Sequence, residues 1–228
     1  MRTKFHLFKS LFILSMLCIP RLNFAQLEWD AETTVIVTPE GKVLTDANDR
    51  LTFMNLFTKN DRIDIEPLAA EKTYRNYEYR INNIRRGQDL YKEVTIFDGN
   101  GNRDFLFVME STSDELDASG IDKARAKWVE LCNAKDSEVL VDQLYHNPTV
   151  YYNSGRAPIT EKETLAKEYS YMNNPNYELN LTSILTTPVT PDIAFEIGQC
   201  SGSYQGKYII IWKKHPEFGW QVLVDSNI

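Results

Sequence analysis

Residues 207–226, KYIIIWKKHPEFGWQVLVDS, are the stretch that decides the fold. They are rich in aromatic and β-branched residues on both sides of a short polar segment, a pattern that predicts two strands joined by a turn. A second stretch, KEVTIFDGNGNRDFLFVMES at residues 92–111, aligns with the first without a gap. Aromatic residues coincide twice in this alignment, and an acid followed by serine closes both segments. The sequence therefore predicts two β-hairpins of the same design.

The same offset holds upstream of the hairpins. Residues 34–37 (TVIV) fall on residues 149–152 (TVYY), and residues 44–46 (LTD) resemble residues 159–161 (ITE). Residues 44–46 and residues 159–161 each precede a helix-like stretch, for which Thr45 and Thr160 are the expected N-caps. A constant spacing at both ends favours an internal repeat. The alternative is that two hairpins with aromatic strands look alike without forming a repeat.

The two halves differ before their first strand. The second half has apolar residues at helical spacing over residues 121–134, including Trp128 and Cys132, and again over residues 137–145. The first half has only residues 26–32 in that place, so it lacks the two helices that would cover one face of its sheet. An apolar sheet face has to be buried. We therefore expect the first sheet to pack against the second half or against a partner chain.

Composition and charge limit the class of protein. The chain has 228 residues, of which 43% are hydrophobic and 25% charged, and this composition is typical of a folded protein. The net charge is −7, and the first 25 residues contain basic residues but no acid. The remainder is thus more acidic still. Binding to nucleic acid or to anionic lipid is therefore disfavoured.

The first 25 residues have the pattern of a secretory signal peptide. Three basic residues lie within residues 1–9, residues 10–19 are apolar, and Ala25 is a small residue suited to cleavage before Gln26. The apolar run is too short to span a membrane. We expect an exported protein without a membrane span, and an uncleaved anchor is the alternative. Export leaves Cys132 and Cys200, which we expect to be buried thiols, although an oxidising compartment also permits a disulfide.

Helix, helix, strand, helix and four long antiparallel strands describe an α+β fold in which helices cover a curved, cone-shaped antiparallel sheet. Residues 128–225 resemble the nuclear transport factor 2-like superfamily, which includes ketosteroid isomerase and the SnoaL-like polyketide cyclases. The resemblance lies in residues 128–136 (WVELCNAKD), 144–145 (LY), 192–198 (DIAFEIG), 206–208 (GKY), 211–213 (IWK) and 219–226 (GWQVLVDS). It implies a complete domain over residues 118–228 and, through the repeat, a degenerate and helix-trimmed half over residues 26–117.

The resemblance also implies where catalytic groups would lie, and the residues there do not match. Trp128 occupies the place of the isomerase tyrosine that donates a hydrogen bond, and indole is a weaker donor. Asn153 occupies the place of the aspartate base, and an amide cannot take up a proton at neutral pH. The leading prediction is therefore a non-catalytic module that binds a small ligand or a partner. The alternative is an enzyme of the SnoaL type, an isomerase, cyclase or dehydratase.

Three residues are candidates for the acid–base chemistry of that alternative. Glu196 lies on a strand and would be a desolvated base if it faced the cavity, whereas on the other face it would be solvated. His146 lies between a helix and a strand, where it can protonate a ligand or bond to a backbone carbonyl in its own loop. Asp225 lies near the end of the last strand and is either a third candidate or a solvated chain end or loop cap.

Aromatic residues crowd the second half, and strand alternation sends Tyr151 and Tyr152 to opposite faces of the sheet. A cavity lined by rings and a few hydroxyl groups suits a flat, mostly apolar ligand, and filling of the core is the alternative. The predicted ligand-binding residues are Trp128, Tyr145, Tyr151, Asn153 and Trp212.

Motifs for metals and cofactors fall short of their patterns. His146 and His215 lie in separate loops, so we expect no histidine-rich metal site, and we expect His215 to be exposed. Residues 98–102 (DGNGN) begin like a calcium loop but lack its glycine and its final glutamate, so they predict a hairpin turn. Residues 202–207 (GSYQGK) lack the spacing of a phosphate-binding loop. We therefore expect no metal and no cofactor. A further alternative for the role of the protein is that its sheets form the surfaces of a homodimer.

Overall fold

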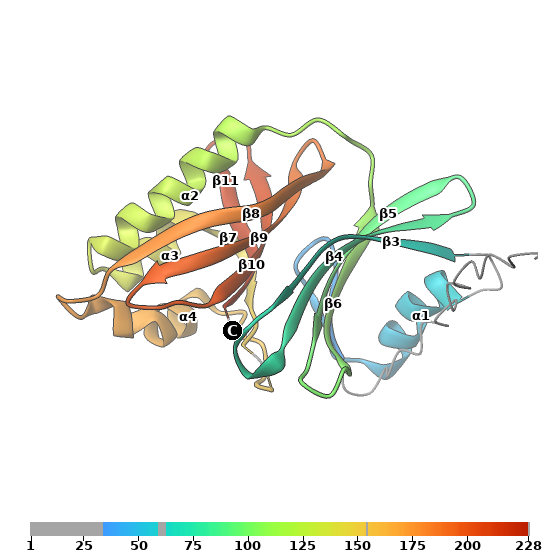
Figure 1. The fold of residues 1–228 in the computed structure, drawn as a ribbon, viewed down its shortest axis with the longest axis horizontal. Coiled ribbons are helices and arrows are strands. Elements are labelled where there is room, and N and C mark those ends of the chain that lie inside the picture. The colour runs from blue at the N-terminus through green and yellow to red at the C-terminus, as the bar shows by residue number, and fades with distance from the viewer. Residues whose placement is uncertain (1–33, 59–62, 154, 228) are drawn as a thin grey trace, which may run out of the picture.

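The structure is a computed structural model that describes residues 34–58, 63–153 and 155–227. The signal peptide predicted over residues 1–25 lies outside these described residues. Two β-sheets face each other in the middle of the molecule, with helices on the outer side of each (Figure 1). No helix in the described part of the chain is long and apolar enough to cross a membrane.

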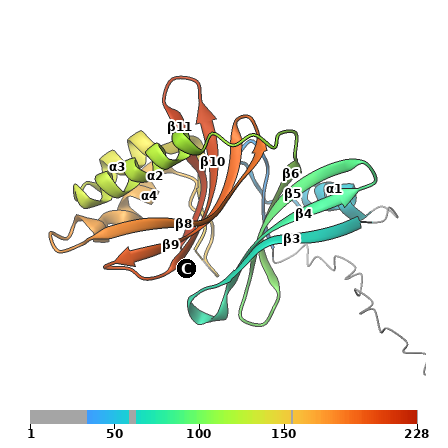
Figure 2. The same ribbon diagram turned by 45° about the horizontal axis from the view of Figure 1, so that its top comes forward.

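The second half has the predicted order of elements. It begins with α2 (Ala118–Asn133) and α3 (Ser137–Leu144), followed by β7 (Tyr145–Tyr151), α4 (Lys162–Glu168) and the 3₁₀ helix η2 (Tyr169–Asn173). Four long strands follow: β8 (Leu179–Thr190), β9 (Ile193–Gly202), β10 (Lys207–His215) and β11 (Gly219–Asn227). Their sheet has the order β7-β11-β10-β9-β8, and the helices cover its outer face (Figures 1 and 2). The predicted α+β fold, an antiparallel sheet covered by helices, is confirmed.

The first half forms a sheet with a related strand order. It contains β1 (Val35–Val37), β2 (Val43–Leu44), α1 (Ala47–Thr58), β3 (Ile63–Lys72), η1 (Tyr74–Asn76), β4 (Glu78–Arg86), β5 (Asp89–Phe97) and β6 (Arg103–Glu110). The sheet order is β2-β1-β6-β5-β4-β3, and β1 pairs in parallel with the last strand, as β7 pairs with β11. The β5–β6 and β10–β11 hairpins lie at the two stretches that align in sequence. A tandem repeat and its boundaries at residues 25 and 117 stay predictions.

Both helix starts predicted at threonine are wrong by one residue. Oδ1 of Asp46 accepts hydrogen bonds from the backbone N–H groups of Asn48 and Asp49, at 2.8 and 3.0 Å, so Asp46 caps α1. The N-cap of α4 is Glu161, whose side chain makes no capping hydrogen bond. Aspartate is at least as good an N-cap as threonine, and the threonine pattern did not distinguish these neighbours.

The two sheets bury their apolar faces against each other. Phe107 of β6 and Phe195 of β9 pack edge to face with ring centroids 5.6 Å apart, in one cluster of buried residues drawn from both sheets. The hydroxyl groups of Tyr79 and Ser226, one from each half, lie 3.1 Å apart and are buried. The first sheet thus packs against the second half, which is one of the two arrangements that we expected for its apolar face.

A second core lies between the helices and the outer face of the second sheet. On α2, Ile121, Ala124, Trp128 and Cys132 are buried at helical spacing, and the Asp117 side chain caps the helix by accepting from the Gly120 N–H at 2.9 Å. Tyr151 belongs to this core and Tyr152 to the core between the sheets, so their predicted divergence is confirmed. Burying apolar residues on one stripe of α2 is what holds the helix on the sheet.

Candidate functional site

A small cavity lies inside the second core, between the helices and the sheet. Its volume, as space open to the centre of a water molecule, is ≈ 20 Å³, which is room for about one water. The lining side chains are aromatic, apolar or sulfur-bearing, apart from the amide of Asn227. They come from α2, η2, the segment that follows η2, the strands β8–β11 and the turn between β9 and β10. They are Trp128, Cys132, Tyr169, Tyr171, Met172, Tyr177, Leu179, Leu181, Cys200, Tyr204, Tyr208 and Asn227.

The cavity lining is uncharged at neutral pH. Burial raises the pKa of the Cys132 thiol and of the Tyr177 and Tyr204 phenols to about 12. Burial likewise raises the pKa of each other cysteine and tyrosine in the lining above its ordinary value. A thiol or phenol with a raised pKa keeps its proton at pH 7. These groups can therefore exchange hydrogen bonds with a ligand without presenting a charge to it.

Trp128 brings a weakly used donor to this lining. Its indole N–H is buried and has no oxygen or nitrogen acceptor, and its contact with the Cys132 sulfur opposes the rise in the pKa of that thiol. The residue is 3% exposed, and the rings of Tyr145, Tyr208 and Trp212 surround it, with centroids 6.0, 6.3 and 6.4 Å away. A thiol is a weak acceptor, so water or an oxygen acceptor on a ligand would satisfy this buried donor better.

Asp225 lies behind the cavity in a hydrogen-bonded group of tyrosines. It is fully buried, so the prediction of a solvated strand end is wrong. Its Oδ2 accepts from the hydroxyl groups of Tyr145, at 2.8 Å, and of Tyr169, while its Oδ1 has no partner. Burial raises the pKa of Asp225 to about 6, and the two tyrosine hydrogen bonds oppose this shift. Asp225 itself does not line the cavity, but Tyr169 connects it to that space.

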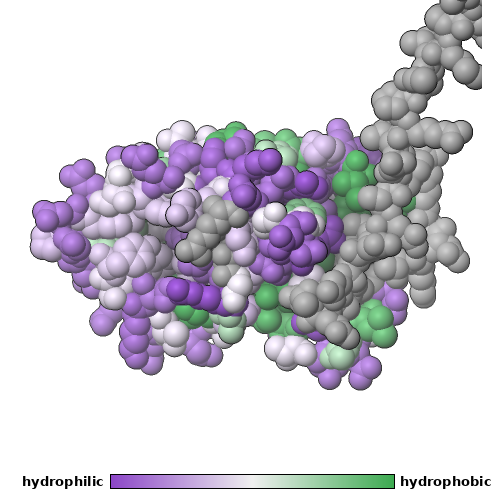
Figure 3. All heavy atoms as spheres, turned by 60° about the horizontal axis from the view of Figure 1, so that its bottom comes forward, coloured by the Kyte–Doolittle hydropathy of each residue, from purple (hydrophilic) through white to green (hydrophobic). Residues whose placement is uncertain are grey.

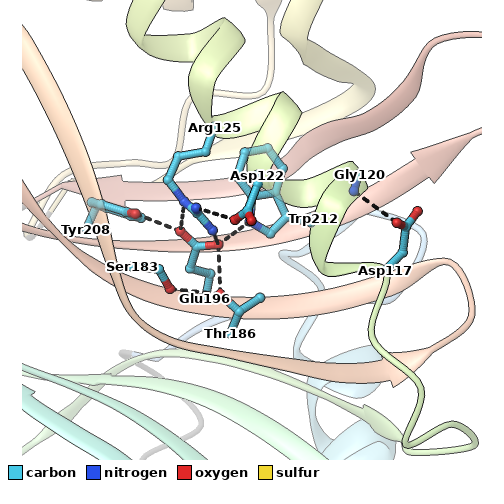
Figure 4. A network of polar contacts seen from close by, with 9 residues as sticks. All are labelled: Asp117, Gly120, Asp122, Arg125, Ser183, Thr186, Glu196, Tyr208 and Trp212. Carbon is cyan, nitrogen blue, oxygen red and sulfur yellow. Dashed lines mark hydrogen bonds and ion pairs between the residues drawn. The ribbon is translucent and has the colours of Figure 1, made fainter.

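Glu196 faces the helices, on the side where we placed the cavity, and it is fully buried. The Arg125 guanidinium donates to both of its carboxylate oxygens, at 2.7 and 2.8 Å (Figure 4). Tyr208, Trp212 and Thr186 donate to the same carboxylate at 2.6, 3.0 and 3.1 Å. Glu196 is not among the residues that line the cavity. The ion pair connects α2 to β9.

His146 lies outside the cavity, at the start of β7. Its Nδ1 is 3.0 Å from the carbonyl oxygen of Pro148, so it bonds to a backbone carbonyl nearby. Burial is the main cause that lowers its pKa. His215 is half-buried rather than exposed as predicted, because its ring stacks on Phe218 with centroids 4.6 Å apart. The centroids of the two imidazole rings are 6.3 Å apart, although they lie far apart in sequence.

The predicted ligand-binding residues separate into three positions. Trp128 lines the cavity. Tyr145, Tyr151 and Trp212 are buried in the surrounding core but are not part of the lining. Asn153 is half-buried just beyond β7, where its side-chain N–H donates to the Tyr151 hydroxyl at 3.3 Å.

Sequence reasoning missed Arg125 and Tyr169. Arg125 follows Ile121 by four residues and precedes Trp128 by three, so helical spacing places it beside the buried stripe of α2. A basic residue there is a signal for a buried acidic partner. Tyr169 is one of many aromatic residues in the second half, and no local pattern relates it to Asp225.

The two cysteines of the second half also lie at the cavity. Cys132 and Cys200 are buried and free, which confirms the expectation of buried thiols. Among the described residues, no three histidine, cysteine or acidic side chains are grouped so that they could hold a metal ion.

Comparisons with known proteins give similarities in fold. No family model and no curated protein matches the sequence. A nuclear transport factor 2-like protein of unknown function from Shewanella oneidensis matches 49% of this chain and 98% of its own, with 14% identity and a TM-score of 0.43. A ketosteroid isomerase-like protein from Erwinia carotovora atroseptica matches 48% of this chain and 95% of its own, with 17% identity and a TM-score of 0.39.

A third solved structure is similar at the same level. It is a nuclear transport factor 2-like protein of unknown function from Pseudomonas putida, with 14% identity and a TM-score of 0.37, and it matches 48% of this chain and 83% of its own. The chain is similar in fold to nuclear transport factor 2-like proteins over about half of its length.

Proposed function

We propose that the second half is a non-catalytic binding module that takes a small, flat, uncharged and mostly apolar molecule into the cavity beside Trp128. The observation that carries the proposal is the neutral aromatic lining, in which the Trp128 N–H has no acceptor other than the Cys132 sulfur. Rings and raised-pKa phenols favour an uncharged ligand, and this N–H supplies one fixed point for an acceptor on that ligand.

The environments of Glu196 and His146, two of the predicted catalytic residues, favour binding over catalysis. The carboxylate of Glu196 already accepts five hydrogen bonds, two of them from Arg125. These donors occupy both carboxylate oxygens, so little capacity is left for a hydrogen bond to a substrate. His146 lies on the outside, bonded to its own segment.

A ligand larger than one water requires the lining to open. Tyr171 is 50% exposed and Tyr204 is partly exposed, whereas Trp128 and Tyr169 are buried. The two exposed tyrosines are therefore the side chains that can move at least cost. Because only the open state binds the ligand, the apparent affinity is reduced in proportion to the fraction of molecules that are open. Removing one of these rings favours the open state and should therefore strengthen binding.

Calorimetric titration of the purified protein with 2-naphthol tests the proposal. We expect saturable binding, tighter binding to Tyr204→Ala, and loss of binding when Cys200→Met fills the cavity. Tyr74→Ala removes an exposed tyrosine of the first half and serves as the matched control. Absence of saturable heat with both the unmodified protein and Tyr204→Ala would rule out the binding function.

A second candidate, an acid–base enzyme, is favoured by one observation. Asp225 has a pKa of about 6 and bonds to Tyr169, which lines the cavity. A carboxyl group with a pKa close to the working pH can exchange a proton through a bonded hydroxyl. Native mass spectrometry compares the molecules that co-purify with the unmodified protein and with Asp225→Asn. If the protein is an enzyme, the variant will hold the unchanged substrate, whereas the unmodified protein will hold a chemically converted species. The same species on both proteins supports binding alone.

We also infer that the protein is exported, on the strength of the leader pattern in residues 1–25. N-terminal sequencing of protein recovered outside the cytoplasm should begin at Gln26. A chain that retains Met1 and stays with the cytoplasmic fraction would contradict export.

A further inference from the structure

A second hollow lies on the outside of the second half, away from the cavity lining. It has a volume of ≈ 510 Å³ by the same measure and is open to solvent. Side chains from α2, α3, α4, the start of β7 and the β10–β11 hairpin surround it. Among them are Lys127, Asp142, His146, Lys162, His215 and Phe218.

The charges around this hollow are mainly positive. Lys127 of α2 and Lys162 of α4 are both half-buried, and Asp142 is the one acid among the residues that line the hollow. Lys162 also borders a neighbouring groove that Glu138 and Glu163 line. Nζ of Lys162 donates to the backbone oxygen of Asp142 at 3.2 Å, not to its carboxylate. Within the described part of the chain, neither lysine has a salt bridge. This positive site lies on a chain whose net charge is −7.

The hydrogen bonds of the two imidazole rings fix where their protons lie. Nδ1 of His215 accepts from the backbone N–H groups of Glu217 and Phe218, at 3.1 and 3.3 Å, so its proton is on Nε2. Nδ1 of His146 donates to the Pro148 carbonyl, so its Nε2 is the atom that takes up a second proton. The neighbouring Lys213, His215 and Lys162 disfavour that second proton, in addition to burial. A bound anion would favour it.

An exposed ring lies beside these positive groups. Phe218 is 66% exposed, and His215 stacks on it at 28° between planes. An exposed phenylalanine next to half-buried lysines offers an apolar surface and a counter-charge at once. That combination matches a ligand with an aromatic ring and an anionic group.

We propose that this hollow binds a small aromatic carboxylate, with its ring against Phe218 and its carboxylate paired with Lys127 and Lys162. The site is separate from the cavity beside Trp128, and its ligand has a charge where the cavity ligand has none. The failure of one site to bind therefore leaves the other unaffected.

Benzoate and benzamidine test the charge requirement, because they share a ring and differ in the sign of their charge. We expect saturable binding of benzoate to the purified protein and none of benzamidine. Lys127→Gln and Lys162→Gln should each weaken benzoate binding roughly fivefold, the value of about 1 kcal/mol for a partly exposed ion pair. Lys123→Gln, on an exposed position of the same helix, is the matched control and should leave the affinity unchanged.

Two further measurements test the ring of Phe218 and the imidazole of His146. Phe218→Ala should weaken benzoate binding, and binding should tighten as the pH falls toward the lowered pKa of His146, because that ring then gains charge beside His215, Lys127, Lys162, Lys213 and Asp142. Equal affinity for benzoate and uncharged benzyl alcohol would overturn the proposal. So would benzoate binding that Lys127→Gln and Lys162→Gln leave unchanged, or no saturable benzoate binding at all.

Discussion

Buried carboxylates have two different environments in the second half. Glu196 is matched by an arginine and three neutral donors, whereas Asp225 has two tyrosine donors and no cation bonded to it. A matched ion pair is costly to break from one side, and burial without a bonded cation raises the pKa of Asp225. Substitution of Arg125 should therefore test the environment of Glu196, and a change of pH should test that of Asp225.

Replacing Arg125 should be strongly destabilising. Arg125→Met leaves Glu196 buried without its cation, and such a loss costs about 3–5 kcal/mol in the free energy of unfolding. Asp122→Asn removes the exposed partner of the same arginine and should cost less than about 1 kcal/mol. Urea unfolding measures both. A cost for Arg125→Met no larger than that for Asp122→Asn would contradict the role of the pair.

Asp225 should make the protein less stable as the pH rises from about 4 to about 6. In the folded state its pKa is about 6, above the ordinary value of 3.8, so the folded protein binds more protons in this interval than the unfolded chain. Stability from this group is greatest below pH 4 and is reduced by roughly 3 kcal/mol above pH 6.

Asp225→Asn removes this titration and keeps an acceptor for Tyr145 and Tyr169. Urea unfolding between pH 4 and pH 7 should show the variant gaining stability relative to the unmodified protein as the pH rises. Parallel pH profiles for the two proteins would show that Asp225 does not titrate as described.

At the scale of the strands, Gly198 of β9 makes room for Tyr208 of β10. The two residues are cross-strand partners, and a Cβ atom at Gly198 would lie 2.1 Å from Cζ of Tyr208. The tyrosine ring crosses the glycine to reach Glu196, to which it donates at 2.6 Å. The absence of a side chain on one strand thus permits a buried hydrogen bond from the next.

Gly198→Ala should therefore cost about 1–3 kcal/mol in stability through overpacking. Tyr208→Leu shortens the crossing side chain, so adding Gly198→Ala to it should cost much less than adding it to the unmodified protein. Chemical unfolding of the four proteins of this cycle gives the coupling. Additive costs would mean that the two residues do not compete for space.

Elements were easier to predict from sequence than the partners of buried polar residues. Alternation in the hairpins and helical spacing over residues 121–145 identified the strands, α2 and α3, because these patterns are local. Arg125 and Glu196 are 71 residues apart, and Asp225 lies 56 and 80 residues from its tyrosine donors. Residues 225–227 (DSN) look like a polar chain end, and only the packed sheet shows that Asp225 is buried.

At the scale of the whole molecule, the two sheets shield each other. The apolar face of each sheet is buried inside the chain, so it is not free to pair with a second copy. On the face drawn in Figure 3, hydrophobic residues form separate small patches among hydrophilic ones where the structure describes the surface. On that face, the patches are smaller than the continuous apolar surfaces that stable association requires.

We therefore predict a monomer in solution. Light scattering on the purified protein should give the mass of one chain, no more than 26.4 kDa. Polar contacts between the halves, such as the 2.7 Å hydrogen bond from Tyr152 to Asp104, should form within one chain. A stable species of twice the mass would contradict this arrangement.

Binding of a neutral, flat molecule in the cavity beside Trp128 is tested most directly by a crystal structure with 6-bromo-2-naphthol, in which anomalous scattering locates the bromine atom. We predict a peak among Trp128, Tyr169 and Cys200, with Tyr171 or Tyr204 displaced. Peaks confined to the outer hollow near Phe218, or to other positions outside the cavity lining, would contradict binding in the cavity.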